Sequence, residues 1–273
     1  MLIDQIFTLL LHFLSISYFV SSEGTASNGD FTCSSGEDDD TGTRSFLLDP
    51  LTHWPNGVVP YVIDPTFSRK QVKILKKNMN LLARVSCVRW IPRTNQKDYV
   101  EIVRSQVPES CSTTVGRIGG RQTLDLGDRC FGAMHGYRGA IRHEMLHTLG
   151  FIHEQQRLDR DCFVWVYNNA ILESPYDYAV TLDTSTSFPY DVHSIMHYPP
   201  SKNMVPIQLG EDIGNKAGLL SKMDKMKLNY MYCGGKSYCE IDPFNCKILR
   251  QVVKRCKLML DKSDNYVTHE YRG

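Results

Sequence analysis

The chain has 273 residues, which is enough for one large domain or two small ones. Its 31 basic and 30 acidic residues give a formal net charge of +1, and its composition is that of an ordinary globular protein. This balance gives no electrostatic case for binding nucleic acid or an anionic membrane surface, so we expect neither partner.

An apolar run lies near the N-terminus, from Ile6 to Val20, and the small residues Ser21 and Ser22 follow it. Its length is typical of a signal-peptide core and is short for a membrane span. The segment before the run lacks the usual Lys or Arg. The alternative is a buried core helix, which a chain terminus rarely forms. We therefore expect residues 1–22 to be a signal peptide, the protein to be secreted and extracellular, and no segment to span a membrane.

Residues 23–44 are rich in Ser, Gly, Thr and Asp and cannot bury a core, which is typical of a linker or propeptide. Nine cysteines fit an oxidising destination, and none forms a CxxC pair that would indicate a cysteine-based zinc site. The cysteines are Cys33, Cys87, Cys111, Cys130, Cys162, Cys233, Cys239, Cys246 and Cys256. If Cys33 leaves with a removed segment, an even number remains.

Folded sequence begins near Trp54, and local patterns then predict its elements in order. We expect strands over 58–63, 87–91 and 99–104, a Gly-rich loop entering a strand over 116–126, and helices over 69–84, 138–149 and 222–230. Ser68 and Ser221 are capping residues at the starts of two helices, and Gly150 ends another. The first helix carries lysines that we expect to be mostly solvated, and the Gly-rich loop lacks the spacing of a phosphate-binding loop.

Three histidines after residue 142 carry the strongest chemical signal. His143 and His147 are four residues apart, so a helix presents both on one face. Gly150 allows a sharp turn through its freedom at positive φ, and His153 can then return to the same ion. A catalytic zinc prefers three protein ligands. The pattern predicts one zinc ion held by His143, His147 and His153.

Glu144 neighbours a predicted ligand but points to a different face of the helix. That position suits a carboxylate beside water activated by the metal, where it can take a proton and pass it to a leaving amine. The alternative is a surface helix with a chance HExxH, which is a serious possibility for the short motif. The added glycine and third histidine make this alternative poor.

The string from His143 to Glu154 resembles the extended HExxHxxGxxH zinc motif of the metzincins. Its continuation, HEQQRLDRD, and the string SIMHY at 194–198 are similar to the zinc motif and methionine turn of the astacin family. Further segments that resemble astacins occur in the expected order at 54–61, 86–93, 115–122 and 218–233. The resemblance covers about residues 45–233. It implies a zinc metalloendopeptidase that hydrolyses peptide bonds in extended protein or peptide substrates.

The resemblance also implies the fold, an α+β metzincin domain of two lobes. The upper lobe would hold a mixed, twisted sheet and helices, including the zinc helix. The lower lobe would be mostly irregular, with the methionine turn and a C-terminal helix. The strand that ends the loop over 116–126 would be the edge strand that lines the cleft, where extended substrate would pair by strand addition.

Residue roles follow from the same resemblance. Met196 would pack beneath the metal as a hydrophobic floor. Tyr198 would be a fifth zinc ligand that swings away to hydrogen-bond the oxyanion, a task that a phenol can perform. Glu154 would contact the new amino terminus, Ser45, once an activating protease has cut after Arg44. On the sequence alone, Met196 and Tyr198 would be ordinary core residues and Glu154 a surface carboxylate.

Latency would depend on an aspartate of the propeptide. Asp30, in the string SNGD, partly matches the blocking motif of astacins, and Cys33 is the alternative blocking ligand. A flexible acidic linker remains the simpler interpretation of this segment.

The resemblance implies the disulfides Cys87–Cys233 and Cys111–Cys130. The pairing of Cys162, Cys239, Cys246 and Cys256 stays open, although Cys162 can consistently clip the tail onto the domain. We expect a catalytic domain over 45–235 and a cysteine-containing tail over 236–273, in which an apolar stripe from Ile248 to Cys256 predicts a packed or docking helix. The second interpretation of the chain is a catalytically inactive binding or toxin-like module on the same scaffold. The third is a structural extracellular protein.

Overall fold

The computed structural model describes residues 46–47, 49–132, 139–181, 187–215 and 217–270, with side chains to residue 260. The predictions for the signal peptide, the propeptide, Asp30, Cys33 and the Arg44–Ser45 bond lie outside the described residues. The described ranges all belong to one compact unit, Gly42–Gly273.

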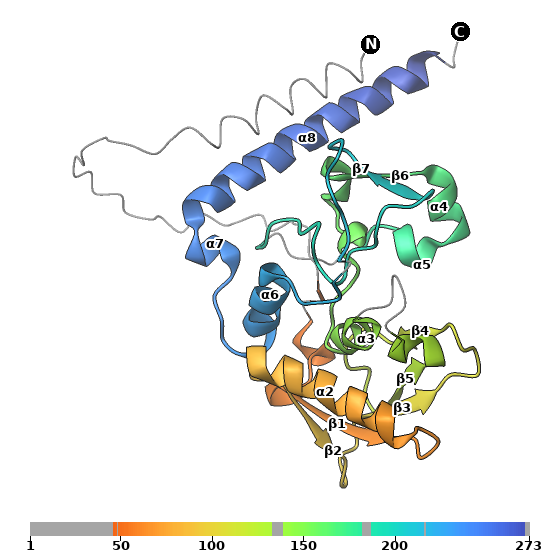
Figure 1. Ribbon diagram of the computed structural model, residues 1–273. Coiled ribbons are helices and arrows are strands. Elements are labelled where there is room, and N and C mark those ends of the chain that lie inside the picture. The colour runs from red at the N-terminus through yellow and green to blue at the C-terminus, as the bar shows by residue number, and fades with distance from the viewer. Residues whose placement is uncertain (1–45, 48, 133–138, 182–186, 216, 271–273) are drawn as a thin grey trace, which may run out of the picture. The chain divides into compact units, whose positions relative to one another are not determined.

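The main sheet has five strands in the order β2-β1-β3-β5-β4 (Figure 1). They are β1 (Val58–Ile63), β2 (Arg89–Pro92), β3 (Tyr99–Arg104), β4 (Cys111–Thr113) and β5 (Arg121–Leu126). Only β4 runs antiparallel to its neighbour. Alternate residues of the strands point inward. Val100, Ile102, Leu124 and Leu126 are fully buried for this reason.

The expectation that the strand after the Gly-rich loop is the edge strand is wrong. That strand, β5, pairs with β3 on one side and with β4 on the other, so β4 forms the edge. The sequence hides β4 because it is only three residues long and has no run of alternating apolar side chains. Strand addition by a substrate would therefore use β4.

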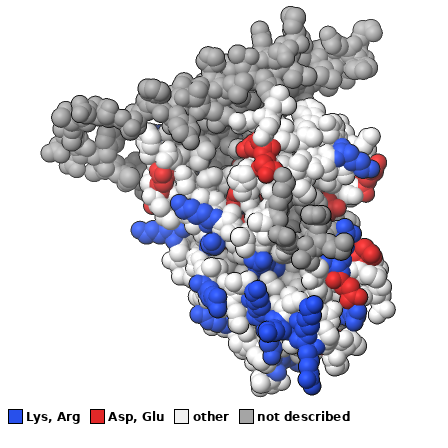
Figure 2. All heavy atoms as spheres, viewed as in Figure 1, with Lys and Arg blue, Asp and Glu red and all other residues white. Residues whose placement is uncertain are grey.

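Two helices, α2 (Arg69–Val85) and α3 (Ala140–Thr148), pack against the sheet and share its core. Ser68 caps α2 in a reciprocal capping box with Gln71, as its sequence predicts. All four lysines of α2 are exposed, which confirms the solvated face (Lys70, Lys73, Lys76 and Lys77). Figure 2 shows basic side chains gathered over this part of the molecule.

A second, smaller lobe has its own core. It contains a two-stranded sheet and two short helices, which are β6 (Val164–Val166), β7 (Met204–Pro206), α4 (Asn168–Glu173) and α5 (Pro175–Tyr178). Val164, Ala170, Tyr178 and Met204 are among the residues buried in this core, which is separate from the core under the main sheet. Two cores give the two-lobed α+β architecture that was expected.

The remaining elements are short or C-terminal. They are the 3-10 helices η2 (Pro50–Thr52), η3 (Pro55–Gly57), η4 (Asp128–Phe131), η5 (Glu154–Gln156) and η6 (Arg160–Cys162), and the helices α6 (Lys222–Tyr232), α7 (Tyr238–Ile241) and α8 (Pro243–Glu270). Among the described helices, none combines the length and apolar character that crossing a membrane requires.

Four disulfides cross-link the described chain. Cys87–Cys233 and Cys111–Cys130 are the two pairs that the family resemblance implied. The structure also resolves the open pairing. Cys162 bonds Cys256 and so attaches α8 to η6, while Cys239–Cys246 closes a small loop between α7 and α8.

Candidate metal centre

Helix α3, which carries His143 and His147, ends in a turn at Gly150 that caps its last carbonyls. This glycine has φ of 97°, a conformation that side chains disfavour, and its N–H donates to the carbonyl of His147 at 2.8 Å. The next N–H, of Phe151, donates to the carbonyl of Leu146 at 3.0 Å. The backbone thereby reverses, and His153 returns beside the helix.

The three predicted histidines meet through their Nε2 atoms. The Nε2 of His153 lies 3.2 Å from the Nε2 of His143 and 3.2 Å from that of His147. On the far side of each helical imidazole, Nδ1 faces a backbone carbonyl: Ile195 at 2.8 Å for His143 and Phe151 at 2.7 Å for His147. These carbonyls favour the tautomer with the proton on Nδ1, which leaves a lone pair on Nε2.

This geometry fits zinc. Four ligands around zinc at about 2.0–2.1 Å place neighbouring nitrogens roughly 3.3 Å apart, close to the two separations observed. Burial lowers the pKa of His147 to about 3 and also lowers those of His143 and His153, so all three rings are neutral near pH 7. Neutral imidazole is the form that binds a metal. In the described part of the chain, these three histidines are the cluster of His, Cys, Asp or Glu side chains that lies close enough together to hold a metal ion.

Glu144 lies in the same buried region. Its side chain is 7% exposed, and burial raises its pKa to about 8 because the charged carboxylate loses its hydration. A cation bound by the adjacent imidazoles would favour the carboxylate form and bring the pKa down. The arrangement therefore offers a buried carboxyl group that exchanges a proton near neutral pH.

The methionine turn is tied to the zinc loop. Ser194 donates from its hydroxyl to Asp224 at 2.6 Å and accepts the N–H of Met196 at 3.0 Å. The carbonyl of Met196 accepts the N–H of Glu154 at 3.0 Å, and the Met196 side chain is buried in the main core. These bonds hold the turn beside the residue that follows His153.

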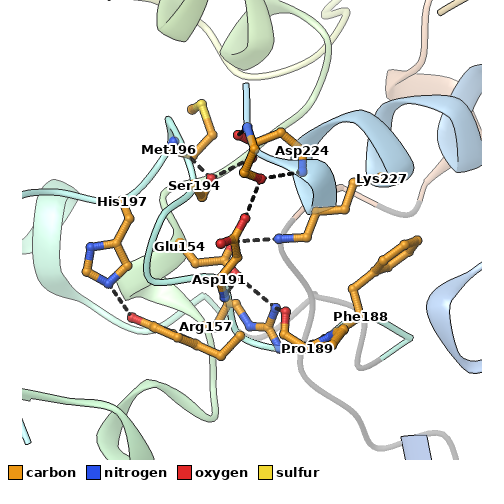
Figure 3. Close-up of polar contacts among 12 residues, drawn as sticks. Glu154, Arg157, Phe188, Pro189, Asp191, Ser194, Met196, His197, Asp224 and Lys227 are labelled. Carbon is orange, nitrogen blue, oxygen red and sulfur yellow. Dashed lines mark hydrogen bonds and ion pairs between the residues drawn. The ribbon is translucent and has the colours of Figure 1, made fainter. Parts of the chain in front are cut away.

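The Glu154 carboxylate is 1% exposed and occupies the centre of a buried ion network (Figure 3). Oε2 accepts from Lys227 at 2.8 Å, and Oε1 accepts from Arg157 and from the backbone of Asp191, each at 2.9 Å. Arg157 also pairs with Asp159 at 2.8 Å. Glu154 is therefore not the surface carboxylate of the simpler interpretation, and two cations already balance it. The predicted contact with Ser45 lies outside the described residues.

Tyr198 stands at the boundary between the zinc site and the second core. Its ring centroid lies 4.5 Å from that of His153, and its hydroxyl donates to Asp177 at 2.9 Å. Burial, followed by the charge of Asp177, raises the pKa of Tyr198. The structure thus brings Tyr198 against a zinc-site imidazole, while its hydroxyl bonds a carboxylate.

Sequence reasoning did not find Lys227, Arg157 or Asp177. Lys227 is fully buried, and 73 residues separate it from Glu154. The charged string after His153 was a signal for Arg157, since several charges follow the motif within nine residues. No local pattern marks Asp177.

Known proteins of one family resemble this chain in sequence and fold. A family model described as Astacin, a peptidase family, matches residues 47–233. The chain belongs to the astacin family. It is 41% identical to zinc metalloproteinase nas-12 of Caenorhabditis elegans over 151 residues, which are 54% of this chain and 37% of that protein. It is 35% identical to high choriolytic enzyme 2 of Oryzias latipes over 187 residues, 64% of this chain and 63% of that enzyme.

Among solved structures, high choriolytic enzyme 1 of Oryzias latipes, a hatching-enzyme zinc protease, matches with a TM-score of 0.57 and 33% identity. The match covers 67% of this chain and 94% of that one. The chain spans only 37% and 35% of the relatives nas-12 and nas-15 from Caenorhabditis elegans. The astacin likeness therefore concerns the peptidase domain, in which the three converging histidines are placed for a metal ion.

Proposed function

We propose that the protein is a secreted zinc-dependent endopeptidase that hydrolyses peptide bonds in extended protein or peptide substrates. The observation that carries the proposal is the convergence of three neutral imidazoles at 3.2 Å with a buried glutamate beside them. The zinc metalloproteinases among the relatives support the same activity.

His143, His147 and His153 would hold one zinc ion. Zinc, when held there, supplies a Lewis acid that activates water and polarises the scissile carbonyl. Glu144 takes the proton of the attacking water and delivers it to the leaving amine, a role that suits a carboxyl whose pKa burial has moved toward neutrality. Tyr198 would donate its hydroxyl to the oxyanion after leaving Asp177.

Substitution of Glu144 tests this assignment. Glu144→Gln keeps the shape of the side chain but cannot accept the proton, so cleavage of a quenched peptide should fall by about 10²–10⁴-fold. The variant should still hold about one zinc per chain by elemental analysis. Glu173→Gln changes a carboxylate on α4 and should retain activity. Unchanged cleavage in Glu144→Gln removes the general base, and absence of stoichiometric metal from the mature protein removes the peptidase assignment.

The same zinc analysis and cleavage assay separate the alternatives. A chain that holds zinc but cleaves no denatured protein or peptide, with or without a chelator, would be the inactive binding or toxin-like module. The histidines, Glu144 and Tyr198 are all present, which favours the enzyme.

Secretion and activation complete the proposal. Residues 1–22 would be removed as a signal peptide, and an activating protease would cut the Arg44–Ser45 bond to release residues 23–44, with Asp30 as the blocking ligand. In support, Phe46 is 1% exposed, and the N–H of Leu47 donates to the carbonyl of Gly150 at 2.9 Å, so the residues just after Ser45 are packed into the domain. Amino-terminal sequencing of the secreted protein tests this, and a start beyond Trp54 would contradict it.

A further inference from the structure

The outer face of helix α2 is strongly basic. The helix carries six basic side chains and no acidic one, and all six are exposed (Figure 2). Because successive residues of a helix are rotated by about 100°, the six positions fall within an arc of about 120° on one side of α2. The opposite side is buried in the main core. The six residues are Arg69, Lys70, Lys73, Lys76, Lys77 and Arg84.

These charges do not stabilise the helix that carries them. Lys73 lies three or four residues from four of the other cations, and like charges at these spacings repel each other on a helix. The first turn has no acidic residue, and the cations there oppose the helix dipole.

No carboxylate balances this face. In the part of the chain that the structure describes, none of the six residues forms an ion pair. At the start of α2, Asp128 accepts from Gln71 at 3.2 Å, but Arg104 already pairs with the same carboxylate at 2.7 Å. The face therefore keeps its full positive charge.

Removal of residues 1–44 would make the whole chain basic. That segment holds seven of the 30 acidic residues and one of the 31 basic residues. A chain that starts at Ser45 therefore has 30 basic and 23 acidic residues, a formal net charge of +7. The near-neutral balance of the full sequence conceals this charge.

The composition of the face selects among polyanions. Asn80 is the other residue of α2 within the arc, so no apolar or aromatic side chain of the helix lies among the cations. A bilayer surface is bound by apolar side chains that enter it, and single-stranded nucleic acid by aromatic stacking. A linear sulfated polysaccharide needs only a row of cations. From Arg69 to Arg84 the row extends for about 22 Å along the helix axis.

We propose that the outer face of α2 binds a sulfated polysaccharide and tethers the mature peptidase to it. The inference rests on the proposed function, because secretion and the removal of residues 1–44 place a basic chain among extracellular polymers. The sulfates take the place of small counterions beside the Lys and Arg side chains, and release of those counterions drives binding. None of the six residues belongs to the zinc site, so tethering leaves the hydrolysis of short peptides unchanged.

The test measures binding of the mature chain, starting at Ser45, to heparin. A fourfold variant changes the lysines of α2 to Gln, a residue that also favours helix. Its affinity for heparin at about 0.15 M salt should fall by about tenfold or more. The slope of log affinity against log salt concentration should decrease in magnitude by about 3–4, because each cation contributes nearly one. The substitutions are Lys70→Gln, Lys73→Gln, Lys76→Gln and Lys77→Gln.

Two variants control for net charge and for the lysine side chain itself. The first removes four charges from exposed lysines outside α2, and its affinity should change by less than about threefold because these charges are scattered. The second changes the four lysines of α2 to Arg and should keep its affinity within about threefold, since every charge remains. All variants should cleave a quenched peptide within about twofold of wild type, which shows that they are folded. The first control combines Lys202→Gln, Lys236→Gln, Lys247→Gln and Lys254→Gln.

Several outcomes would overturn the inference. Equal losses in the two Gln variants would show that net charge, and not the face of α2, determines binding. Loss of affinity in the Arg variant would show that charge is not the basis of binding. Tighter binding of wild-type protein to a DNA duplex or to phosphatidylserine vesicles than to heparin would identify another partner.

The outcomes also separate this inference from the proposed function. A mature chain that cleaves peptide but does not bind heparin overturns the inference alone. A chain that binds heparin through α2 but holds no zinc and cleaves no peptide overturns the peptidase assignment alone.

Discussion

The buried carboxylate of Glu154, beside the zinc site, is balanced by two individual cationic side chains. Burial alone would raise the pKa of Glu154, but the charges of Lys227 and Arg157 and the hydrogen bonds from Lys227 and the Asp191 backbone lower it. Lys227 is 0% exposed, so its ammonium has exchanged water for this carboxylate. Removal of Lys227 or of Glu154 leaves this buried network with one uncompensated charge.

Lys227→Met should therefore destabilise the protein strongly, by about 3–5 kcal/mol, because Glu154 loses one of its two cationic partners while staying buried. Urea unfolding measures the change. Lys225→Met is the matched control on the same helix, since Lys225 is exposed, and it should change stability by less than about 0.5 kcal/mol. Addition of Glu154→Gln to Lys227→Met should recover part of the loss. Equal stability of the two lysine variants would show that the ion pair contributes nothing.

Single residues also show where sequence reasoning succeeded. The histidine ligands were predictable because their relation is local: a four-residue helical spacing and a glycine turn place all three rings. Lys227 and Asp177 were not, because their partners lie 73 and 21 residues away and each contact depends on tertiary packing. Site residues related by a fixed spacing can be predicted from the sequence, whereas site residues brought together by tertiary packing cannot.

At the scale of elements, the glycine turn after α3 decides whether the third ligand reaches the ion. An added Cβ at Gly150 would meet only Met231 Cε at 3.3 Å, so space is nearly sufficient. The backbone is the obstacle, since φ of 97° is a conformation that L side chains rarely adopt.

Gly150→Ala should cost about 1–3 kcal/mol of stability and speed zinc loss to a chelator by about tenfold or more, because relief of the strain moves His153. Gly210→Ala is the control, because Gly210 has φ of 81° and an added Cβ would meet nothing within 4 Å. It should lose comparable stability but retain zinc normally. If both variants lose zinc equally fast, the turn has no special relation to the metal.

The Gly-rich loop before β5 is anchored by Asp98. Its Oδ1 accepts the N–H of Gly120 at 2.7 Å, and Oδ2 pairs with Arg117 at 2.6 Å. The Gly120 hydrogen bond and then Arg117 lower the pKa of Asp98 below its ordinary value of 3.8. The lowered pKa means that the folded state favours the carboxylate, so the stabilisation is complete above 3.8 and disappears as pH falls through the lower folded value.

Asp98→Asn should therefore be less stable than wild type at pH 7, by about 1–2 kcal/mol, because it loses the charged acceptor. The gap between the two proteins should close as the pH falls below about 3.8, where wild type also becomes neutral. Thermal unfolding from about pH 7 down to about pH 2 measures it. Glu109→Gln, at an exposed position, should show no comparable gap. A gap that is constant with pH would contradict the electrostatic origin.

Secondary-structure elements were likewise predictable where local sequence determines them and not where tertiary pairing does. The helices α2 and α6 were close to their predicted bounds because capping boxes and apolar spacing are written in the local sequence. The strand β4 was missed, and the edge was assigned to β5, because Cys111–Thr113 becomes a strand only through pairing with Leu124–Leu126. Strand order depends on such pairings and not on any one segment.

For the whole molecule, one long-range disulfide reinforces the main core and another attaches a helix that lies outside both cores. Cys87–Cys233 joins the segment before β2 to the end of α6 across 146 residues, within the peptidase domain. Cys162–Cys256 instead fastens α8 to the second lobe at η6. The idea that Cys162 clips the tail onto the domain is confirmed. The choice of Cys256 as its partner and the pairing of Cys239 with Cys246 were beyond prediction, since sequence alone does not determine connectivity.

The combined substitution Cys162→Ser and Cys256→Ser should release the tail without unfolding the domain, because α8 carries exposed apolar side chains such as Phe244 and Ile248 and lies outside the main core. Limited proteolysis followed by mass spectrometry should show cleavage between residues 236 and 260, with residues 47–233 resistant and peptide hydrolysis within about twofold of wild type. Loss of Cys87–Cys233 by paired serines should lower stability by about 2–5 kcal/mol. If the tail stays protected after loss of Cys162–Cys256, packing alone holds α8, and its apolar side chains belong to a larger contact with the second lobe.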